Sequence, residues 1–327
     1  MTGIKELYGR ASGFLAKHHI RGIYILIILY VVIVTVINPV FLTGNNIMNL
    51  LRQVAVVGVI SCGITFVMLT GRTDLSAGMM MTYLAAISCY FVLPGVNNQF
   101  MAILAPLVLG LVFGLVNGIL VGVIRLNSFV STLGMMSIYT GAVLLFTKRN
   151  PSLFADNEMA VYKFIGQGSV LGVPTPVIIL LIVAFICSCV LKKTVYGARI
   201  YAVGSNVSMA RFSGINPAAI IVSTYVIAGL ATGLGALIMA SRIMAAQPKM
   251  GVGYEFTALT AIVLGGLRIT GGKGTIWGTI IGVVILGIID NSFVILGLDS
   301  NLQYVVKGII LAVAVASQLM SDRRQAL

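Results

Sequence analysis

The sequence predicts an all-α polytopic membrane protein, and three observations support this fold class. Of the 327 residues only 9% are charged, whereas 59% are hydrophobic, and the mean hydropathy is +1.06. Soluble domains carry about a quarter charged residues, so this chain has too few to cover a water-facing surface. The apolar residues are also gathered into runs of about 20, the length that a helix needs to cross a bilayer. Basic residues lie between these runs.

About ten apolar stretches are expected to form membrane elements, some of them broken or re-entrant. They are residues 22–42, 47–70, 75–93, 100–124, 129–147, 176–191, 218–240, 256–267, 275–296 and 303–318. The stretch 256–267 is too short to cross upright and is expected to be a half-helix. The chain then divides into a cytoplasmic tail (1–21), one transmembrane domain (22–319) with a cytoplasmic loop (192–217), and a cytoplasmic tail (320–327).

Lysine and arginine set the orientation, because cytoplasmic loops of membrane proteins carry an excess of both. With the N-terminus inside, the cytoplasmic segments hold Lys5, Arg10, Lys17, Arg21, Arg72, Arg125, Lys192, Lys193, Arg199, Arg211, Arg268, Lys273, Arg323 and Arg324. The outer segments then hold Lys148, Arg149, Lys163, Arg242 and Lys249, with the acids Asp156, Glu158, Glu255 and Asp299. Both termini are therefore expected in the cytoplasm.

The net charge of +13 follows from this topology and does not indicate a nucleic-acid partner. The cations lie one to four at a time between apolar stretches, not in a soluble basic domain. The longest polar interruption is 192–217, KKTVYGARIYAVGSNVSMARFSGINP, which carries no acidic residue. Such a loop cannot lie in lipid, where unpaired peptide groups are costly. We expect it to be the main surface that faces the cytoplasm.

Glycines recur every four residues in two of the stretches. They are Gly110, Gly114, Gly118 and Gly122 in the first, and Gly274, Gly278 and Gly282 in the second. This spacing places them on one helix face, where another backbone can approach closely. Tight helix packing is the favoured interpretation, and a pore-lining groove is the alternative.

Two glycine-containing breaks have similar sequences. Residues 67–81 read VMLTGRTDLSAGMMM, and residues 262–276 read IVLGGLRITGGKGTI. Both contain a glycine, an arginine, a small polar stretch and another glycine between apolar runs, which indicates an internal repeat. Duplicated halves with broken helices beside the substrate path are common in transporters.

The sequence contains no set of residues suited to catalysis. The two histidines, His18 and His19, lie in the N-terminal tail. A phosphate-binding GxxxxGK[ST] loop is absent, since GGKGT at 271–275 lacks the first glycine. The four cysteines are interpreted as small packing residues, because C-x-C at 187–189 is not a zinc or redox spacing. We therefore predict no enzyme, no ATPase site, no catalytic residue and no metal ligand, which also disfavours an enzyme acting on lipid-linked substrates.

Arg72, Asp74 and Ser76 lie at the first break. Asp74 and Ser76 could cap the next helix, and Arg72 could anchor the chain at the cytoplasmic rim. Ionisable groups at membrane depth also mark substrate paths, so the same residues could form a gate. Both interpretations stay open.

Three further polar residues lie within apolar stretches. Asn117 forms either a hydrogen bond between helices, which is favoured, or part of the path. Asp290 and Asn291 either mark the point where the helix leaves the membrane, which is favoured, or contact a polar solute. An ion-coupled secondary transporter is disfavoured because Asp74 and Asp290, both at the ends of stretches, are the acids available to it.

Four blocks resemble the permeases of ribose and other monosaccharide ABC importers, a superfamily that includes branched-chain amino acid permeases. They are GRTDLSAG (71–78), SFVSTLGMMSIYTGAVLLFT (128–147), YGARIYAVGSNVSMARFSGIN (196–216) and GYEFTALTAIVLGGLRITGGKGTIWGTIIGVVILGIIDN (253–291). The resemblance runs in order from about residue 38 to residue 318.

This resemblance implies the partners and the setting. It implies a second permease chain (expected to be identical), an ATPase subunit that binds ATP and Mg²⁺, and an extracytoplasmic solute-binding protein, all at a bacterial inner membrane. This chain would then need no cofactor of its own. The solute would be small and polar, most simply a monosaccharide such as ribose.

The resemblance also implies site residues and leaves the solute open. A helix that couples to the ATPase is expected in 201–215, with the residues Tyr201, Gly204, Ser205, Asn206, Arg211, Gly214 and Ile215. Gly204 and Gly214 would bracket it, and Ser205 or Asn206 would cap it. The family usually has glycine and isoleucine before Asp-Leu-Ser, whereas this chain has Arg72-Thr73. Nucleosides, furanosyl signal molecules and amino acids therefore remain alternative solutes.

Overall fold

The computed structural model describes residues 27–93, 95–147, 153–154 and 159–325. The tail predicted at 1–21, with its two histidines and four of the predicted cytoplasmic cations, lies outside the described residues. So do four residues assigned above to the outer segments, Lys148, Arg149, Asp156 and Glu158.

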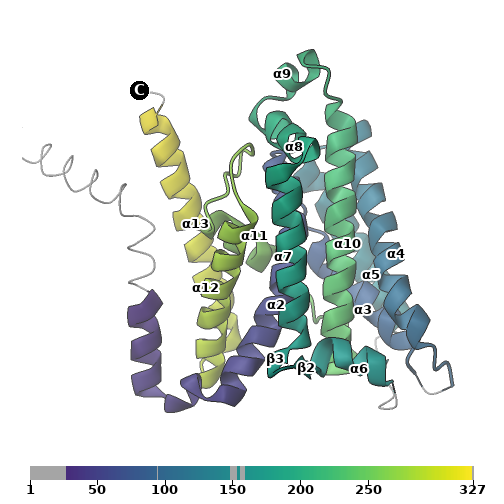
Figure 1. Cartoon of the computed structure of the whole chain (residues 1–327), viewed down its shortest axis with the longest axis vertical. Coiled ribbons are helices and arrows are strands. Elements are labelled where there is room, and N and C mark those ends of the chain that lie inside the picture. Colours follow the sequence, from purple (N-terminus) through teal and green to yellow (C-terminus); the bar gives the residue numbers. More distant parts are fainter. Residues whose placement is uncertain (1–26, 94, 148–152, 155–158, 326–327) are drawn as a thin grey trace, which may run out of the picture.

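The described residues are almost entirely helical (Figure 1). The helices are Ile27–Ile37, α2 (Gly44–Leu69), α3 (Ala77–Tyr90), α4 (Gln99–Gly118), α5 (Ser128–Phe146), α6 (Ala160–Gln167), α7 (Thr175–Lys193), α8 (Val195–Ser205), α9 (Val207–Phe212), α10 (Pro217–Ile243), α11 (Tyr254–Leu264), α12 (Ile276–Ile295) and α13 (Ser300–Gln325). A 3₁₀ helix, η1 (Pro39–Leu42), precedes α2, and a π-helical turn, η2 (Ile119–Val123), extends α4. The described two-residue strands pair as β1 (Leu153–Phe154) with β4 (Ala245–Ala246) and β2 (Ser169–Val170) with β3 (Val173–Pro174).

The predicted fold class is confirmed. Seven described helices are long and apolar enough to cross a membrane: Gly44–Leu69, Gln99–Val123, Ser128–Phe146, Thr175–Lys193, Pro217–Ile243, Ile276–Ile295 and Asn301–Gln318. Three shorter apolar helices are Ile27–Ile37, Ala77–Tyr90 and Tyr254–Leu264. Together these helices correspond to the ten predicted stretches. The last helix, α13, continues to Gln325, into the segment expected to form the C-terminal tail.

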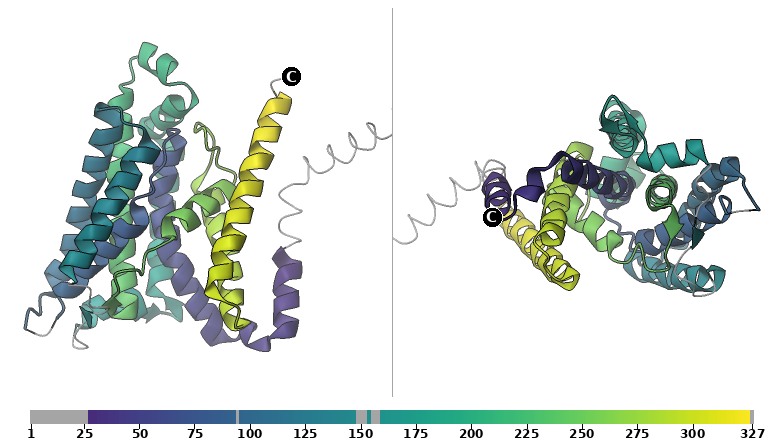
Figure 2. Two further views of the ribbon diagram at one scale, coloured as in Figure 1. Left: turned by 180° about the vertical axis from the view of Figure 1, so that it is seen from behind. Right: turned by 90° about the horizontal axis from the view of Figure 1, so that it is seen from below.

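The helices form two groups that α2 joins (Figures 1 and 2). In one group α10 contacts α4, α3 and α6, and in the other α12 contacts α11 and α13. α2 contacts both α10 and α12. Residues 54–69 of α2 are all buried, because this part of the helix lies between the two groups and contacts helices of both.

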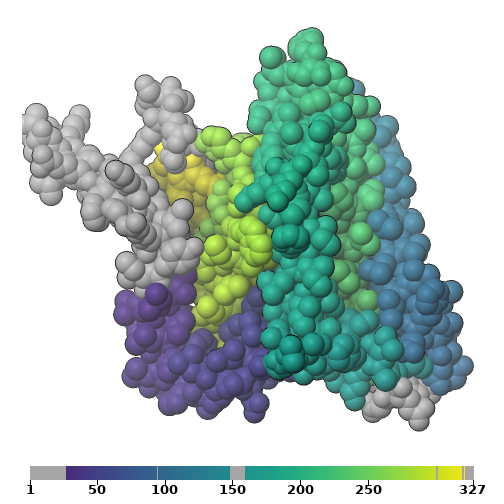
Figure 3. Space-filling model, viewed as in Figure 1, coloured from purple at the N-terminus to yellow at the C-terminus, as the bar shows by residue number. Residues whose placement is uncertain are grey.

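The two ends of the molecule differ. α8 and α9 lie at one end, with the C-terminal end of α13, and this is called the α9 end (Figure 1). η1, α6 and the β2–β3 hairpin lie at the opposite end, called the α6 end. The space-filling view shows the α9 region as the part of the surface that projects furthest (Figure 3).

Both glycine rows pack against other helices, as favoured above. A Cβ atom on Gly114 would lie 2.4 Å from the carbonyl oxygen of Tyr225 in α10, and one on Gly110 would lie 2.5 Å from that of Gly229. In the second row a Cβ atom on Gly282 would lie 1.9 Å from the carbonyl oxygen of Ala261 in α11. Glycine in these rows lets backbones touch, which is how small residues bring membrane helices together.

Each break separates a long helix from a short one. α3 has 14 residues and α11 has 11, so they measure about 21 Å and 16 Å against a hydrocarbon core of about 30 Å. The half-helix predicted at 256–267 is confirmed, while α3 is shorter than the predicted 75–93. At the first break the long helix α2 precedes the short helix α3, whereas at the second break the short helix α11 precedes the long helix α12. The two breaks have similar sequences, but the order of long and short helices is reversed between them.

Candidate functional site

Backbone from three distant segments meets near the α9 end. The residues are Leu69, Gly71, Gly204, Gly271 and Gly272, called here the glycine junction. The Gly272 N–H donates to the Leu69 carbonyl oxygen at 2.9 Å. A Cβ atom on Gly204 would lie 1.8 Å from that same oxygen and 2.6 Å from the Gly272 nitrogen. The end of α8 therefore touches both breaks, and only a residue without a side chain fits there.

Two neighbours of Gly204 strengthen this contact. The Tyr201 hydroxyl donates to the Gly274 carbonyl oxygen at 2.9 Å. Burial raises the pKa of Tyr201 above its ordinary value, so this phenol remains a proton donor. The Cα of Ser205 lies 3.0 Å from where a Cβ atom on Gly272 would be. The predicted coupling residues of α8 thus pack directly on the second break.

α9 follows after a single residue and faces outward. The Asn206 side-chain oxygen accepts from the Met209 N–H at 3.0 Å, so Asn206 is the N-cap expected above. Gly214, at a φ of +77°, lets the chain turn after the helix, since glycine adopts this conformation without strain. Arg211 is exposed, and Phe212 is 86% exposed. Large apolar side chains displayed on a projecting helix are typical of a protein contact surface.

Three of the predicted path residues form one buried chain of hydrogen bonds. The Ser76 hydroxyl donates to Asp74 Oδ1 at 2.7 Å, and the Asn117 amide donates to the Ser76 hydroxyl at 2.8 Å. Each of the three residues is 1% exposed or less. Asn117 therefore makes the favoured bond between helices. The expected cap differs in detail, because the Ser76 hydroxyl donates to Asp74 rather than accepting from the helix.

The non-helical segment before α3 is held by side chains from other helices. The Tyr225 hydroxyl of α10 donates to the Thr73 carbonyl oxygen at 2.7 Å, and the Leu75 N–H donates to Thr132 Oγ1 of α5 at 3.1 Å. Irregular backbone at membrane depth needs such partners. Sequence reasoning missed both residues. The sequence shows Tyr225 and Thr132 only as polar side chains inside apolar stretches, and this pattern does not reveal which backbone groups they bind.

A basic cavity lies at the α9 end. It measures about 760 Å³, and Arg72, Arg125 and Arg211 line it together with Gly214 and Ile215. No acidic residue lines it. The cavity therefore joins one predicted path residue, Arg72, to three residues of the predicted coupling segment.

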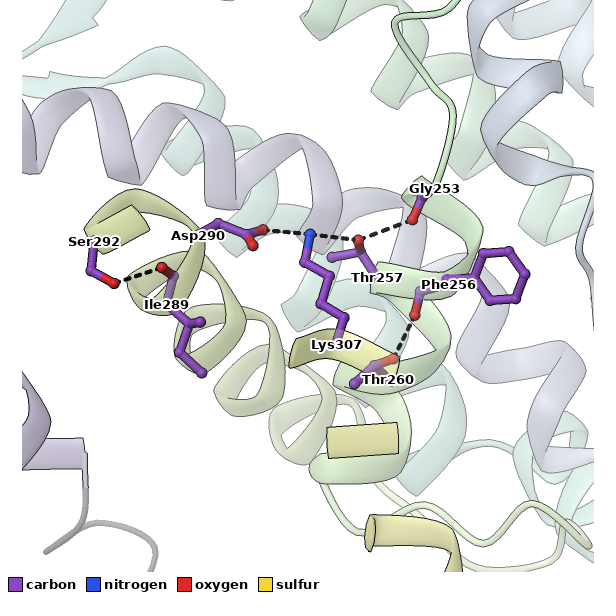
Figure 4. A network of polar contacts seen from close by, with 8 residues as sticks. All are labelled: Gly253, Phe256, Thr257, Thr260, Ile289, Asp290, Ser292 and Lys307. Atoms are coloured by element: carbon purple, nitrogen blue, oxygen red, sulfur yellow. Dashed lines mark hydrogen bonds and ion pairs between the residues drawn. The ribbon is translucent and has the colours of Figure 1, made fainter. Parts of the chain in front are cut away.

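Asp290 and Asn291 lie apart from these residues, in the last turns of α12. Each is 7% exposed, and α12 continues to Ile295, so both side chains are enclosed by protein, while the expectation that the helix leaves the membrane here stays a prediction. Both can stay inside because each has a polar partner. Asp290 Oδ2 lies 2.8 Å from Lys307 Nζ (Figure 4). The Asn291 and Asn46 side chains donate to each other at 2.9 and 2.8 Å.

Two more charged residues are enclosed within the helices, and sequence reasoning did not predict the burial of Glu255 or consider Lys307. Glu255, assigned above to an outer segment, is 1% exposed in the first turn of α11. Its carboxylate lies against α3, where a Cβ atom on Gly78 would be 2.0 Å from Oε2. A negative group in the first turn also suits the positive end of the helix dipole. Lys307 was not considered, although a lysine inside an apolar stretch is a recognisable signal.

Comparison with known proteins identifies the family. The family model described as "Branched-chain amino acid transport system / permease component" matches residues 46–315. The chain belongs to this family. It is 40% identical to the ribose import permease protein RbsC of Bacillus subtilis over 90% of this chain and 89% of that protein. Identity to RbsC of Escherichia coli K12 is 37% over 92% of this chain and 93% of the relative.

A third permease of the family is the D-allose transport system permease protein AlsC of Escherichia coli, which is 33% identical over 84% of each chain. No solved structure matches the chain. The resemblance to permeases of monosaccharide importers is therefore confirmed over nearly the whole chain. Its family is that of a permease component, and seven of its described helices are long and apolar enough to cross a membrane, so the protein is a multi-pass membrane transport component.

Proposed function

We propose that this chain is the transmembrane permease of a binding-protein-dependent ABC importer for a monosaccharide, with ribose as the first candidate. The chain would form the translocation path in the bacterial inner membrane, while ATP and Mg²⁺ bind to a separate ATPase subunit. The observation that carries the choice of solute is the 40% identity to a ribose import permease over 90% of the chain. A permease of D-allose among the relatives supports the wider class of monosaccharides.

The partner surface for the ATPase is α9. Its exposed Arg211 and Phe212 offer one charge and one aromatic anchor, a combination that protein interfaces favour. The basic cavity beneath α9 would complement an acidic patch on the ATPase. In this proposal the α9 end faces the cytoplasm, both termini lie there, and the α6 end receives the solute-binding protein.

The glycine junction supports a coupling route from the ATPase to the path. A shift of α9 moves α8, and the end of α8 contacts backbone at both breaks. Closely packed groups pass on such a displacement because they compress little. Movement of the first break would reach the buried Asp74–Ser76–Asn117 chain through the loop that precedes α3. Rigid-body motion of packed elements is a known way to switch between two states.

Reconstitution tests the proposal. The chain is incorporated into proteoliposomes with its ATPase subunit, and ATP hydrolysis and sugar uptake are measured with a binding protein loaded with D-ribose, D-allose or L-arabinose. We expect one loaded binding protein to stimulate hydrolysis and to drive uptake of its sugar. If the assembly contains a second, identical permease chain, the total mass of the purified complex should equal that of two permease chains and two ATPase subunits. Failure of the ATPase to associate with the chain would refute the importer proposal.

A further inference from the structure

A second polar cavity lies in the other group of helices, away from the glycine junction. It measures about 230 Å³ and is lined by Gln53, Thr257, Asp290, Gln303, Tyr304 and Lys307, among others. These residues come from the first half of α2, the first turns of α11 and α13, and the last turns of α12. The cavity therefore lies in the half of the molecule nearer the α6 end (Figure 1).

A buried ion pair forms one wall of this cavity (Figure 4). Lys307 Nζ lies 2.8 Å from Asp290 Oδ2 and donates to the Thr257 hydroxyl at 3.2 Å. The Thr257 hydroxyl in turn donates to the Gly253 carbonyl oxygen at 3.0 Å. A buried ion pair is seldom better for stability than well-packed apolar residues. Its presence inside an apolar helix pair therefore calls for a functional explanation.

One atom of the pair is left without a partner. Asp290 Oδ1 is buried and has no hydrogen-bond partner among the described residues, although Asp290 as a whole is 7% exposed. An unsatisfied buried acceptor costs about 1–3 kcal/mol, more if charged. Oδ1 is closed to a water-sized probe in this structure, so a ligand hydroxyl would remove this penalty only after a rotation of the Asp290 carboxylate toward the cavity.

The remaining lining matches a neutral, polyhydroxylated ligand. Each sugar hydroxyl both donates and accepts, and the amide groups of Gln53 and Gln303 can do the same. Lys307 keeps one N–H beyond the two that it uses for Asp290 and Thr257. Tyr304, 54% exposed, offers a ring against which the C–H face of a sugar can pack.

The charge and the volume of the cavity limit the class of ligand. The charges of Asp290 and Lys307 cancel, and the exposed Lys249, which also lines the cavity, leaves one net positive charge. A cation is therefore disfavoured, and the phosphate probe in the test below decides between a neutral ligand and an anion. A volume of about 230 Å³ is below the roughly 300–1,000 Å³ typical of pockets for drug-sized ligands. It is large enough for several water molecules at about 30 Å³ each, which is the scale of a single monosaccharide and not of a disaccharide.

We propose that this cavity, bounded by Asp290, Lys307, Gln53 and Gln303, is a monosaccharide subsite on the side where solute enters. The choice of a sugar as the ligand rests on the proposed function. The geometry adds where the sugar is held and which groups hold it: the Asp290 carboxylate as acceptor, Lys307 as donor and the two glutamines as both.

The test uses cysteine protection on the full chain in lipid nanodiscs. Val252→Cys, at a position that lines the cavity and is 43% exposed but is not one of the proposed sugar-binding groups, is labelled with a neutral maleimide with and without D-ribose, and inorganic phosphate serves as the anionic probe. At a ribose concentration of about twice the Kd the labelling rate should fall about threefold, following 1 + [L]/Kd. Gln247→Cys, exposed and outside the cavity, is the matched control and should show no change. The native chain, whose four cysteines are buried or half-buried, gives the background.

Further substitutions separate binding from folding. Adding Gln53→Ala, Gln303→Ala or Asp290→Asn to Val252→Cys should abolish protection by ribose. Gln53→Ala leaves the Asp290–Lys307 pair intact, so its result stands even if Asp290→Asn unfolds the chain. Equal labelling rates with and without ribose, or protection by phosphate alone, would overturn the subsite.

The cysteine-protection test of the subsite and the reconstitution test of the importer can fail separately. Uptake in proteoliposomes without protection at Val252→Cys would refute the subsite and leave the importer intact. Protection without any binding-protein-stimulated hydrolysis would support the subsite and refute the importer.

Discussion

Gly204→Ala is the substitution that tests the glycine junction most directly. The new Cβ atom would lie 1.8 Å from the Leu69 carbonyl oxygen, whereas real Cβ atoms essentially never approach within 3.0 Å. α8 would have to retreat by the difference, about 1.2 Å. Overpacking of this kind costs about 1–3 kcal/mol, and weakening of the Gly272–Leu69 hydrogen bond adds about 1 kcal/mol. A bias of about 2 kcal/mol between transport states changes their ratio about thirtyfold.

We expect Gly204→Ala to lower uptake and stimulated ATP hydrolysis by at least about tenfold. Membrane insertion should be unchanged, because it depends on the apolar stretches and their flanking charges. The assay is uptake and hydrolysis in proteoliposomes, with insertion measured by carbonate extraction. Gly134→Ala in α5, where a Cβ atom meets nothing within 4 Å, is the matched control. Wild-type uptake by Gly204→Ala would refute the coupling role of the junction.

Three further predictions concern α9 and the buried polar pairs. Arg211→Glu should weaken association with the ATPase subunit several-fold at low salt and less at high salt, measured by biolayer interferometry, because an exposed charge acts through a screened field. Asn117→Ala should lower the unfolding temperature in detergent, since it removes a buried hydrogen bond of about 1 kcal/mol; an unchanged temperature would show that the bond contributes nothing. Asn46→Ala and Asn291→Ala should be less destabilising together than the sum of their single effects, with a coupling of about 1 kcal/mol in a denaturation cycle; strict additivity would argue against a reciprocal amide pair.

The apolar pattern predicted most of the fold because the bilayer imposes it. Each run of suitable length has to become a helix in lipid, so ten stretches yield ten helices. The helix boundaries at the two breaks could not be predicted in the same way. Residues 75–93 read as a spanning stretch, yet α3 is shorter, because Gly71 at a φ of +73° and the Asp74 hydrogen bonds hold the preceding segment in a non-helical form.

The candidate site was predictable as a set of residues but not as a set of contacts. Asp74, Ser76 and Asn117 were each visible as polar groups in apolar surroundings, and the fold joins them. Asp290 was interpreted as a residue at the end of a helix because its partner, Lys307, lies on a different helix. A single sequence gives the chemistry of each residue and leaves its distance from the others undetermined.

The location of the glycines distinguishes an extended helix contact from the small contact to which the proposed coupling route assigns movement. In the α4–α10 contact, the glycines from Gly110 to Gly122 face α10 along the second half of α4 and through η2, so many contacts would have to change together for the helices to slide. At the glycine junction the contact involves the end of α8 and two loops, with hydrogen bonds from Gly272 to Leu69 and from Tyr201 to Gly274. Two hydrogen bonds of about 1 kcal/mol each are few enough to break and re-form with the free energy that a docked partner would supply. In the proposed coupling route the extended α4–α10 contact therefore stays fixed, and the small contact at the end of α8, one residue before α9, is the one that changes.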